Sequence, residues 1–505
     1  MTAFDVVDHI PALPEVLLLI GACTVMIADL YVKDEGRRPT VMVAQIVLAI
    51  CAATTLLVFW GSSDPRSEAL VVQKYYLFNG LFVADAMSHL LKLVCYLAVS
   101  TALVYSRSYL AERRLLRGEF VSLLLFSLLG MMVLISANSF LTLFLGLELM
   151  SLCLYALVAL NRDSAQSTEA AMKYFVLGAL SSGLLLYGMS MIYGATGTLT
   201  MPEVAEQVER LAASGADRSL LVFGLVFVVA GLAFKIGVVP FHMWLPDVYH
   251  GATTPVTLIV SSGPKLAAFA MAMRMLVNGL PALAHDWQQM LALLAILSIA
   301  LGNITAIAQS NLKRMLAYSA IAHMGFMLLG LLSGWVGGNW LNRADAYSAS
   351  LFYMIVYTIM TVGSFGMLIY LSHAGFECEN LDDLRGLNRR SPWHAFLMLI
   401  IMFSLAGIPP TAGFYAKLAV FQAAVAAGHL WLAVAAVLLS LVGAYYYLRI
   451  VKLMYFDEPV ATTAMNIRVQ PVGRLVLSAN GLFLLFLGLL PQGLMAMCAA
   501  AVAAL

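Results

Sequence analysis

Gly231-Leu-Ala-Phe-Lys235-Ile-Gly-Val-Val-Pro240-Phe-His242 is the stretch that decides the fold, because it sets a lysine and a proline inside a long apolar run. A lysine charge at the centre of a bilayer costs about 3 kcal/mol on insertion scales. Lys265 and Lys417 lie in similar apolar surroundings. Side chains held at that cost usually carry ions or protons. The pattern therefore predicts a membrane chain whose buried lysines move protons.

The composition indicates an all-α polytopic membrane protein. Of the 505 residues, 62% are hydrophobic and only 11% are charged, whereas soluble proteins carry about 25% charged residues. The net charge of +1 gives no support for a nucleic-acid partner. The acidic N-terminus lacks the basic start of a signal peptide, so we expect the first apolar run to be a retained helix.

Several cofactor classes have no support in the sequence. The six cysteines are scattered singly, and without a Cys-x-x-Cys pair there is no pattern for an iron–sulfur or zinc-thiolate site. Neither nucleotide-binding glycine motif occurs. The nine histidines are not paired at helical spacing in two spans, as a haem site would need. We therefore expect no cofactor in this chain and no transport driven by bound ATP.

The apolar runs predict fourteen membrane spans, since about 20 apolar residues are needed to cross the hydrocarbon. The longest connections fall near 61–77, 196–218, 375–394 and 456–472, and none is large enough to fold alone. The expected spans are 13–32, 40–60, 78–105, 119–136, 139–160, 170–195, 219–244, 254–279, 286–307, 313–335, 348–374, 395–425, 428–455 and 473–497.

Lysine and arginine in the loops predict the orientation, because cytoplasmic loops carry the excess of these residues. The inner side would hold Lys33, Arg37, Arg38, Arg107, Arg113, Arg114, Arg117, Arg162, Lys313, Arg314, Arg385, Arg389, Arg390, Arg449, Lys452, Arg468 and Arg474. The outer side would hold only Arg66, Lys74, Arg210, Arg218 and Arg343. This bias predicts that both termini lie on the outer side of the membrane, which agrees with an even number of spans.

Two spans share a Gly-x-x-Pro pattern in mid-span, at Gly237 to Pro240 and at Gly407 to Pro410. Proline removes a backbone hydrogen bond and breaks a helix, and the freed carbonyls then need partners or water. The breaks lie five spans apart, so successive units of five would have opposite topology. We expect two broken helices in inverted repeats with a transfer site at the breaks. The alternative is two unrelated proline kinks.

Glu148, in the fifth span, is the expected charge partner of a buried lysine, and Lys235 lies about one turn before the first break. A nearby carboxylate favours the charged form of a lysine, whereas burial disfavours it. If the distance between the two groups changes, Lys235 can therefore gain and lose a proton, with freed carbonyls as further partners. The alternative is an ion pair that only locks helices together.

The other ionisable side chains in the spans allow two interpretations, a place in a proton pathway or a structural role. We expect Lys265 and Lys417 to continue the proton pathway. Lys173 could instead reach the membrane interface. His242 follows the first break and His323 lies in the tenth span; each relays protons or is a hydrogen-bonded structural residue.

A further group lies in the third span, where Asp85, His89 and Lys92 share one helix face at i, i+4 and i+7. We interpret it as a helix contact or a subunit interface rather than as part of the pathway.

Three long motifs resemble the antiporter-like membrane subunits of respiratory complex I. They are residues 234–252, from Phe-Lys-Ile-Gly to His-Gly-Ala, residues 311–325, Asn-Leu-Lys-Arg-Met-Leu-Ala-Tyr-Ser-Ala-Ile-Ala-His-Met-Gly, and residues 407–417, Gly-Ile-Pro-Pro-Thr-Ala-Gly-Phe-Tyr-Ala-Lys. The resemblance covers roughly residues 80–455. Within the family the chain is most similar to the subunit N branch. Its paralogues carry either an additional lateral helix or a glutamate at the position of Lys417.

The resemblance implies a domain organisation. It comprises an N-terminal three-helix segment (1–118), a first five-helix repeat (119–279), a second repeat (286–455) and a C-terminal loop and helix (456–505).

Functional roles also follow from the resemblance. Glu148 and Lys235 match the family's ion pair, Lys265 its connecting lysine and Lys417 its exit-side residue, while Lys173 and His242 match accessory positions. NADH, FMN, iron–sulfur clusters and quinone would belong to partner subunits of the membrane arm and of the peripheral NADH-oxidising arm. The expected function is proton translocation in an NADH:quinone oxidoreductase. The alternatives are a subunit of an Mrp-type cation/proton antiporter and a structural scaffold.

Overall fold

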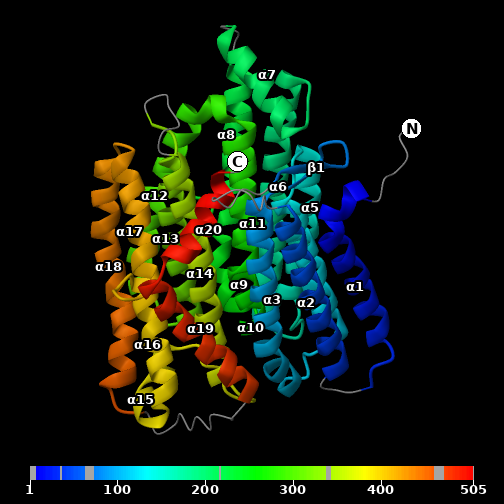
Figure 1. Ribbon diagram of the computed structural model, residues 1–505. Coiled ribbons are helices and arrows are strands. Elements are labelled where there is room, and N and C mark those ends of the chain that lie inside the picture. The colour runs from blue at the N-terminus through cyan, green and yellow to red at the C-terminus, as the bar shows by residue number, and fades with distance from the viewer. Residues whose placement is uncertain are drawn as a thin grey trace.

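The computed structural model describes residues 7–33, 37–62, 73–214, 218–336, 343–459 and 471–503, which form a bundle of upright helices (Figure 1). Arg66 and Arg468, two of the cations used above for orientation, lie outside the described residues. The elements are η1 (Val7–Ala12), α1 (Leu13–Asp29), α2 (Arg38–Gly61), β1 (Tyr75–Leu77), β2 (Phe82–Ala84), α3 (Ala86–Glu112), α4 (Gly118–Ile135), α5 (Phe140–Val158), α6 (Ala165–Thr196), α7 (Met201–Ala213), α8 (Ser219–Ile236), α9 (Trp244–Gly251), α10 (Thr254–Ser261), α11 (Gly263–Ala272), η2 (Met273–Gly279), η3 (Pro281–Leu283), α12 (Ala284–Ile307), α13 (Leu312–Leu332), α14 (Arg343–Leu371), η4 (Leu381–Leu384), α15 (Leu387–Arg390), α16 (Pro392–Ala406), α17 (Ala412–Ala426), α18 (Leu430–Tyr455), α19 (Pro471–Leu489) and α20 (Gln492–Ala503).

The predicted all-α membrane fold is confirmed. Among the described residues, thirteen helical stretches are long and apolar enough to cross a membrane. The two shorter apolar helices α16 and α17 lie on either side of the break at Gly407 and together make a fourteenth. The start of α1 and the end of α20 both lie toward the end of the bundle that carries α7 (Figure 1). This placement agrees with an even number of crossings.

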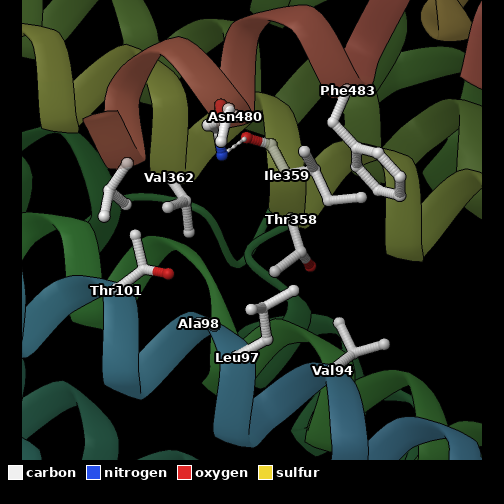
Figure 2. A pocket seen from close by; sticks show the side chains of 11 residues that line it. Val94, Leu97, Ala98, Thr101, Thr358, Ile359, Val362, Asn480 and Phe483 are labelled. Atoms are coloured by element: carbon white, nitrogen blue, oxygen red, sulfur yellow. Dashed lines mark hydrogen bonds between the residues drawn. The ribbon is translucent and has the colours of Figure 1, made fainter. Parts of the chain in front are cut away.

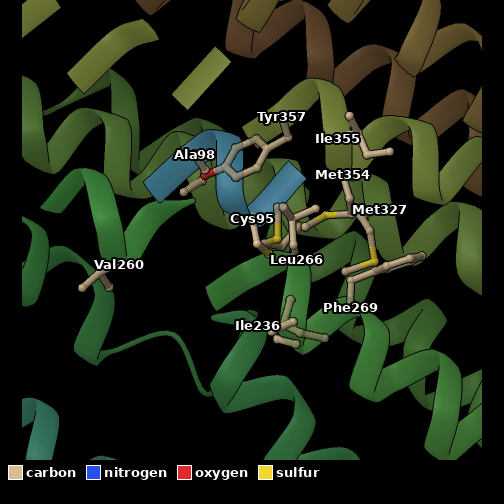
Figure 3. Packing of buried hydrophobic residues seen from close by; sticks show 14 of the residues in the cluster. Cys95, Ala98, Ile236, Val260, Leu266, Phe269, Met327, Met354, Ile355 and Tyr357 are labelled. Carbon is tan, nitrogen blue, oxygen red and sulfur yellow. The ribbon is translucent and has the colours of Figure 1, made fainter. Parts of the chain in front are cut away.

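The centre of the bundle is formed by α14, α13 and the segment from α10 to η2, which are buried along nearly their whole length. Figure 3 shows Cys95 of α3, Leu266 of α11 and Met354 of α14 packed together in this core. In contrast, α2, α18 and α19 turn many large apolar side chains outward, as a surface in contact with lipid requires. Lys265 of α11 therefore lies within this closely packed centre, whereas Lys235 of α8 and Lys417 of α17 lie on helices that pack against it.

The predicted start of the third span at residue 78 is wrong. Residues 75–84 form the antiparallel hairpin β1–β2, in which Tyr76 pairs with Val83, and α3 begins only at Ala86. The hairpin also binds the turn between α4 and α5, since the Val83 N–H donates to the Ser136 carbonyl at 2.8 Å. Aromatic and β-branched residues suit a strand as well as an apolar helix, which is why this run was assigned to the span.

The connection 196–218, one of the four longest expected from the sequence, is partly helical. It contains the helix α7, which places Met201, Val204 and Val208 on its buried face. The helix is tied to the hairpin end of the bundle, because the Met201 N–H donates to the Asn138 carbonyl at 2.9 Å. Its polar positions alternate with these apolar ones at helical spacing, so the segment has no apolar run long enough to span a membrane.

Candidate functional site

The first predicted break follows α8. Gly237 has a φ of 83°, a left-handed conformation that favours glycine. The N–H groups of Gly237 and Val238 both donate to the Ala233 carbonyl, at 2.9 and 3.0 Å. The Phe234 carbonyl accepts instead from Nε1 of Trp244 at 3.0 Å. The indole N–H of Trp244 on α9 therefore binds the carbonyl that the break leaves without a backbone donor.

The second break, after α16, has the same backbone pattern. Gly407 has a φ of 81°, and the N–H groups of Gly407 and Ile408 donate to the Phe403 carbonyl, each at 2.9 Å. Here the freed carbonyl belongs to Ala406, and it accepts from Nζ of Lys417 at 2.9 Å. The prediction of two broken helices is thus confirmed, and at the second break the buried lysine itself binds a freed carbonyl.

Lys235 and Glu148 are brought near one another but are not in direct contact. Nζ of Lys235 donates to Oγ of Ser151 at 3.1 Å, one helical turn from Glu148 on α5. No ion pair within 4.0 Å joins the two side chains, although Glu148 acts electrostatically on the lysine. Oε1 of Glu148 is buried without a hydrogen-bond partner. The expected contact with freed carbonyls is also absent, because Trp244 occupies the carbonyl of Phe234.

Lys265 lies in the first turn of α11 and is 2% exposed. Its Nζ makes no hydrogen bond within the described part of the chain. The ammonium group lies 5.9 Å from the ring centre of Tyr249 and 5.5 Å from that of Tyr357. Aromatic faces attract a cation without binding it in one geometry, so this lysine is held loosely.

His323, on α13, is buried between two tyrosines. Its Nδ1 lies 2.6 Å from Oη of Tyr353 and its Nε2 lies 3.1 Å from Oη of Tyr447. Lys417 and Lys265 both act electrostatically on the ring. The side chain is therefore hydrogen-bonded, as the structural alternative expected, and it also lies between two lysines of the expected pathway.

Lys417, on α17, is 7% exposed and firmly bound. Besides the Ala406 carbonyl, its Nζ donates to Oγ of Ser440 on α18 at 2.8 Å. The ring of Phe326 lies 5.0 Å from the ammonium group. In the part of the chain that the structure describes, this lysine forms no ion pair. It is held by neutral oxygens, unlike Lys235 with its carboxylate neighbour.

Lys173 lies at the surface rather than in the core, with 43% of its side chain exposed, and forms ion pairs with Glu169 at 2.7 Å and Asp247 at 2.8 Å. Arg314 of α13 binds the same Asp247 at 2.8 Å. Burial by itself would raise the pKa of Asp247, but the hydrogen bonds from Lys173 and Arg314 outweigh it and hold the pKa below the ordinary value. His242 lies within the first break, with Nδ1 buried and unpartnered.

Comparisons with known proteins agree with this geometry. Residues 137–443 match the family model described as NADH:quinone oxidoreductase/Mrp antiporter, TM. An NADH-quinone oxidoreductase subunit N from Herminiimonas arsenicoxydans is 56% identical over 98% of both chains. The chain belongs to the subunit N family. A chain of respiratory complex I from Thermus thermophilus is 33% identical, with a TM-score of 0.78, over 97% of this chain and 100% of that one.

The fold is shared more widely than the subunit N family. A chain in the structure of the Mrp complex from Dietzia superposes with a TM-score of 0.81 at 22% identity, over 98% of this chain and 97% of that one. At that identity the likeness concerns the fold alone. The family model and the 56% identity to a subunit N confirm the resemblance to antiporter-like subunits, and to subunit N among them.

Sequence reasoning missed the partners of the lysines. Ser151, Ser440 and Trp244 bind groups at the two breaks, and Tyr353 with Tyr447 binds His323. These residue types are ordinary in membrane helices, so only the packing of the helices reveals their role. The one signal available was the position of Trp244, which follows the first break by four residues.

In the third-span group of Asp85, His89 and Lys92, two of the three side chains form ion pairs with other helices. Asp85 forms a fully buried two-point ion pair with Arg274 of η2, at 2.6 and 2.8 Å. Lys92 pairs with Glu15 of α1 at 2.6 Å. His89 is buried with both ring nitrogens unpartnered, so the helix-contact interpretation does not account for it.

An apolar cavity of about 320 Å³ lies apart from these groups, between α3, α14 and α19 (Figure 2). Leu97, Val362 and Phe483 line it, and Nδ2 of Asn480 donates to the Ile359 carbonyl at 3.2 Å on its wall. None of the lysines described above lines it. The cavity therefore belongs to the outer packing of the bundle rather than to the candidate site.

Proposed function

We propose that this chain is a proton-translocating membrane-arm subunit of an NADH:quinone oxidoreductase. Quinone reduction takes place in other subunits, which also hold FMN, the iron–sulfur clusters and the quinone. The chain itself carries no redox group and contributes only a proton pathway. It lies in the bacterial inner membrane with both termini on the periplasmic side, in contact with other membrane-arm subunits and joined through them to the peripheral NADH-oxidising arm.

The observation that carries this proposal is the series of basic groups that links the two broken helices. Lys235 lies half-buried at the first break, and Lys417 binds a carbonyl freed at the second. The ring of Tyr357 is close to both Lys265 and His323, and the ring of Phe326 is close to both His323 and Lys417. Titratable groups inside a membrane bundle are costly and mark proton relays. A scaffold would not need four of them in one series.

The separation of Glu148 from Lys235 supplies the switch. When the carboxylate approaches, it stabilises the ammonium form of Lys235; when it retreats, burial favours release of the proton. The structure has the lysine on the Ser151 hydroxyl and Oε1 of Glu148 unpartnered, so both groups are free to change partners. The released proton passes to Lys265, which has no hydrogen-bond acceptor to hold it, then to His323 and Lys417.

Movement of Glu148 would be driven by charge changes that follow quinone reduction in the neighbouring subunits. The inverted five-helix repeats, 119–279 and 286–455, provide one half-pathway each, and the matching hydrogen bonds of the two breaks support this division.

Against this proposal stands the Mrp-type antiporter. The 56% identity to an NADH-quinone oxidoreductase subunit N supports the oxidoreductase, whereas the likeness to the Mrp complex is one of fold. Deletion of the gene separates the two functions. Loss of NADH-driven proton uptake is expected, whereas salt-sensitive growth with normal NADH oxidation would favour the antiporter.

The proposal is tested by NADH-driven proton uptake into inverted membrane vesicles. Lys235→Ala and Glu148→Gln should each abolish most of the uptake that depends on this subunit, in complexes whose assembly is verified. Glu206→Gln is a matched control, because it neutralises a carboxylate that pairs with Arg210 on the exposed helix α7. Full uptake by an intact complex with either pathway variant would rule out the role of that residue.

A further inference from the structure

One face of α3 carries four buried titratable side chains at successive turns: Asp85, His89, Lys92 and Tyr96, spaced i, i+4, i+7 and i+11. None is more than 2% exposed. This stripe lies in the N-terminal three-helix segment, outside the two five-helix repeats. Burying four such groups on one helix face is costly, and packing against α1 and α2 needs only apolar side chains.

Two members of the stripe are accounted for by their contacts. Asp85 caps α3 and is neutralised by Arg274 at 2.6 Å. Tyr96, the deepest member, exchanges a hydrogen bond with Thr55 of α2 at 3.2 Å. Lys92 faces Glu15 of α1 at 2.6 Å, a carboxylate–lysine pair like the one expected at the first break, but already in contact.

His89 is the member that contacts do not explain. Its side chain is 1% exposed, and neither ring nitrogen has a hydrogen-bond partner among the described residues. A buried imidazole without partners is costly, because each unsatisfied nitrogen loses its hydrogen bonds to water and gains none in return. The charged groups that act on it are Lys92 and Asp85, on the same face of α3, and the ring of Phe59 from α2 packs edge-on against it.

The stripe runs along α3 from the hairpin end of the bundle toward its interior. α3 starts directly after the hairpin β1–β2, and Glu15 lies in the first turn of α1, behind the short helix η1, which packs against β1. His89 precedes Lys92 by three residues and so lies about 4.5 Å closer to the hairpin end of the bundle. The whole group lies within about three turns of that end.

We propose that Glu15, Lys92 and His89 form a second proton-exchange site, which passes protons between the interior of the bundle and the water at its hairpin end. In the step, an N–H bond of the Lys92 ammonium breaks and an N–H bond forms on the imidazole of His89, directly or through one water. The opposite ring nitrogen then loses its proton to water at the hairpin end. Glu15 remains a carboxylate throughout and attracts the next proton to Lys92, which arrives past the hydroxyls of Thr55 and Tyr96.

Lys92→Arg separates this role from a structural one. Arginine keeps the positive charge opposite Glu15 but cannot be deprotonated in a protein. In assembled complexes in inverted vesicles, Lys92→Arg and His89→Gln should both lower the number of protons moved per NADH oxidised. Tyr105→Phe is the matched control, because it removes a buried, unpartnered hydroxyl from α3 beyond the stripe and should leave the ratio unchanged. A wild-type ratio in Lys92→Arg would overturn the proposal.

A second measurement tests the proton-exchange site if a variant fails to assemble. It also tests the site if the wild-type complex moves no protons, a result that would contradict the proposed function but not this site. The full chain is placed in lipid vesicles and its infrared spectrum is recorded between about pH 2 and 9, because a buried imidazole can titrate well below the ordinary histidine pKa of about 6.5. We expect an imidazole signal that titrates in wild type and Tyr105→Phe and is lost in His89→Gln. If His89→Gln removes no titrating signal, the site does not exchange protons.

Discussion

The two broken helices have the same backbone and bind their lysines differently. At the first break Trp244 takes the freed carbonyl, and Lys235 is left on a serine hydroxyl near Glu148, whose Oε1 is buried without a hydrogen-bond partner. At the second break Lys417 takes the freed carbonyl itself and a serine hydroxyl as well. The first lysine therefore has a carboxylate neighbour that it does not contact, whereas the second is bound by neutral oxygens. In the proposed mechanism, the first half responds to charge and the second half receives the proton.

The largest expected effect comes from adding one methyl group at each break. Alanine at Gly237 or Gly407 must adopt a left-handed conformation, which costs about 1–2 kcal/mol. The new Cβ at Gly407 would lie 2.8 Å from Cδ of Lys417, whereas at Gly237 it would lie 2.4 Å from Cδ1 of Leu245, a packing residue. We expect Gly407→Ala to displace the lysine and lower proton uptake per assembled complex more than Gly237→Ala does. Equal losses would mean that the two breaks do not differ in this way.

A smaller effect is expected from removing the two serine hydroxyls. Ser151→Ala takes away the one hydrogen bond of Lys235 and should drive the lysine onto Glu148, whereas Ser440→Ala leaves Lys417 on the Ala406 carbonyl. A hydrogen bond to a charged group contributes about 1.5–3 kcal/mol. We therefore expect about a tenfold loss of proton transfer rate for Ser151→Ala and a several-fold smaller loss for Ser440→Ala. Single-turnover proton uptake measures both, and the reverse order would break the comparison.

The smallest effect concerns the ion network beyond the first break, where Asp247 joins Lys173 to Arg314. Burial opposes the charge of Asp247, but its two hydrogen-bonded cations hold its pKa below the ordinary value, which is about 3.9. The network thus stabilises the fold above that pH, and the contribution is lost as the pH falls through the lower folded pKa. The unfolding temperature of Asp247→Asn should therefore vary less between about pH 5 and 2 than that of wild type. Identical pH profiles would show that the network contributes no stability.

The sequence could predict those features that a residue determines at its own position, but not those that depend on which helices pack together. Glycine and proline fix the backbone at their own positions, so Gly237 and Gly407 located both breaks. The buried lysines were visible because charge is rare in apolar runs. The hydroxyls of Ser151 and Ser440 were not, since their role depends on which helices pack together. The same is true of Lys313, which was assigned to a loop but is 2% exposed and paired with Glu379.

Prediction from the sequence also failed where the same amino-acid composition is compatible with two kinds of secondary structure. Residues 75–84 are apolar enough for a helix and form a hairpin. The π-helix η2 has an ordinary helical sequence, and its position is fixed by the buried pair of Arg274 with Asp85. A further interruption at Ser262, between α10 and α11, lacked the Gly-x-x-Pro pattern and was missed, although it places Lys265 at a helix start.

The central claim is that Lys235 works by changing its distance from Glu148, and exchanging the two side chains tests it most directly. The double variant Glu148→Lys with Lys235→Glu keeps both charges in the bundle but removes the lysine from the first break. NADH-driven proton uptake by assembled complexes is then compared with that of wild type. We expect the exchange to abolish the uptake that depends on this subunit, whereas normal uptake would show that the pair only holds helices together.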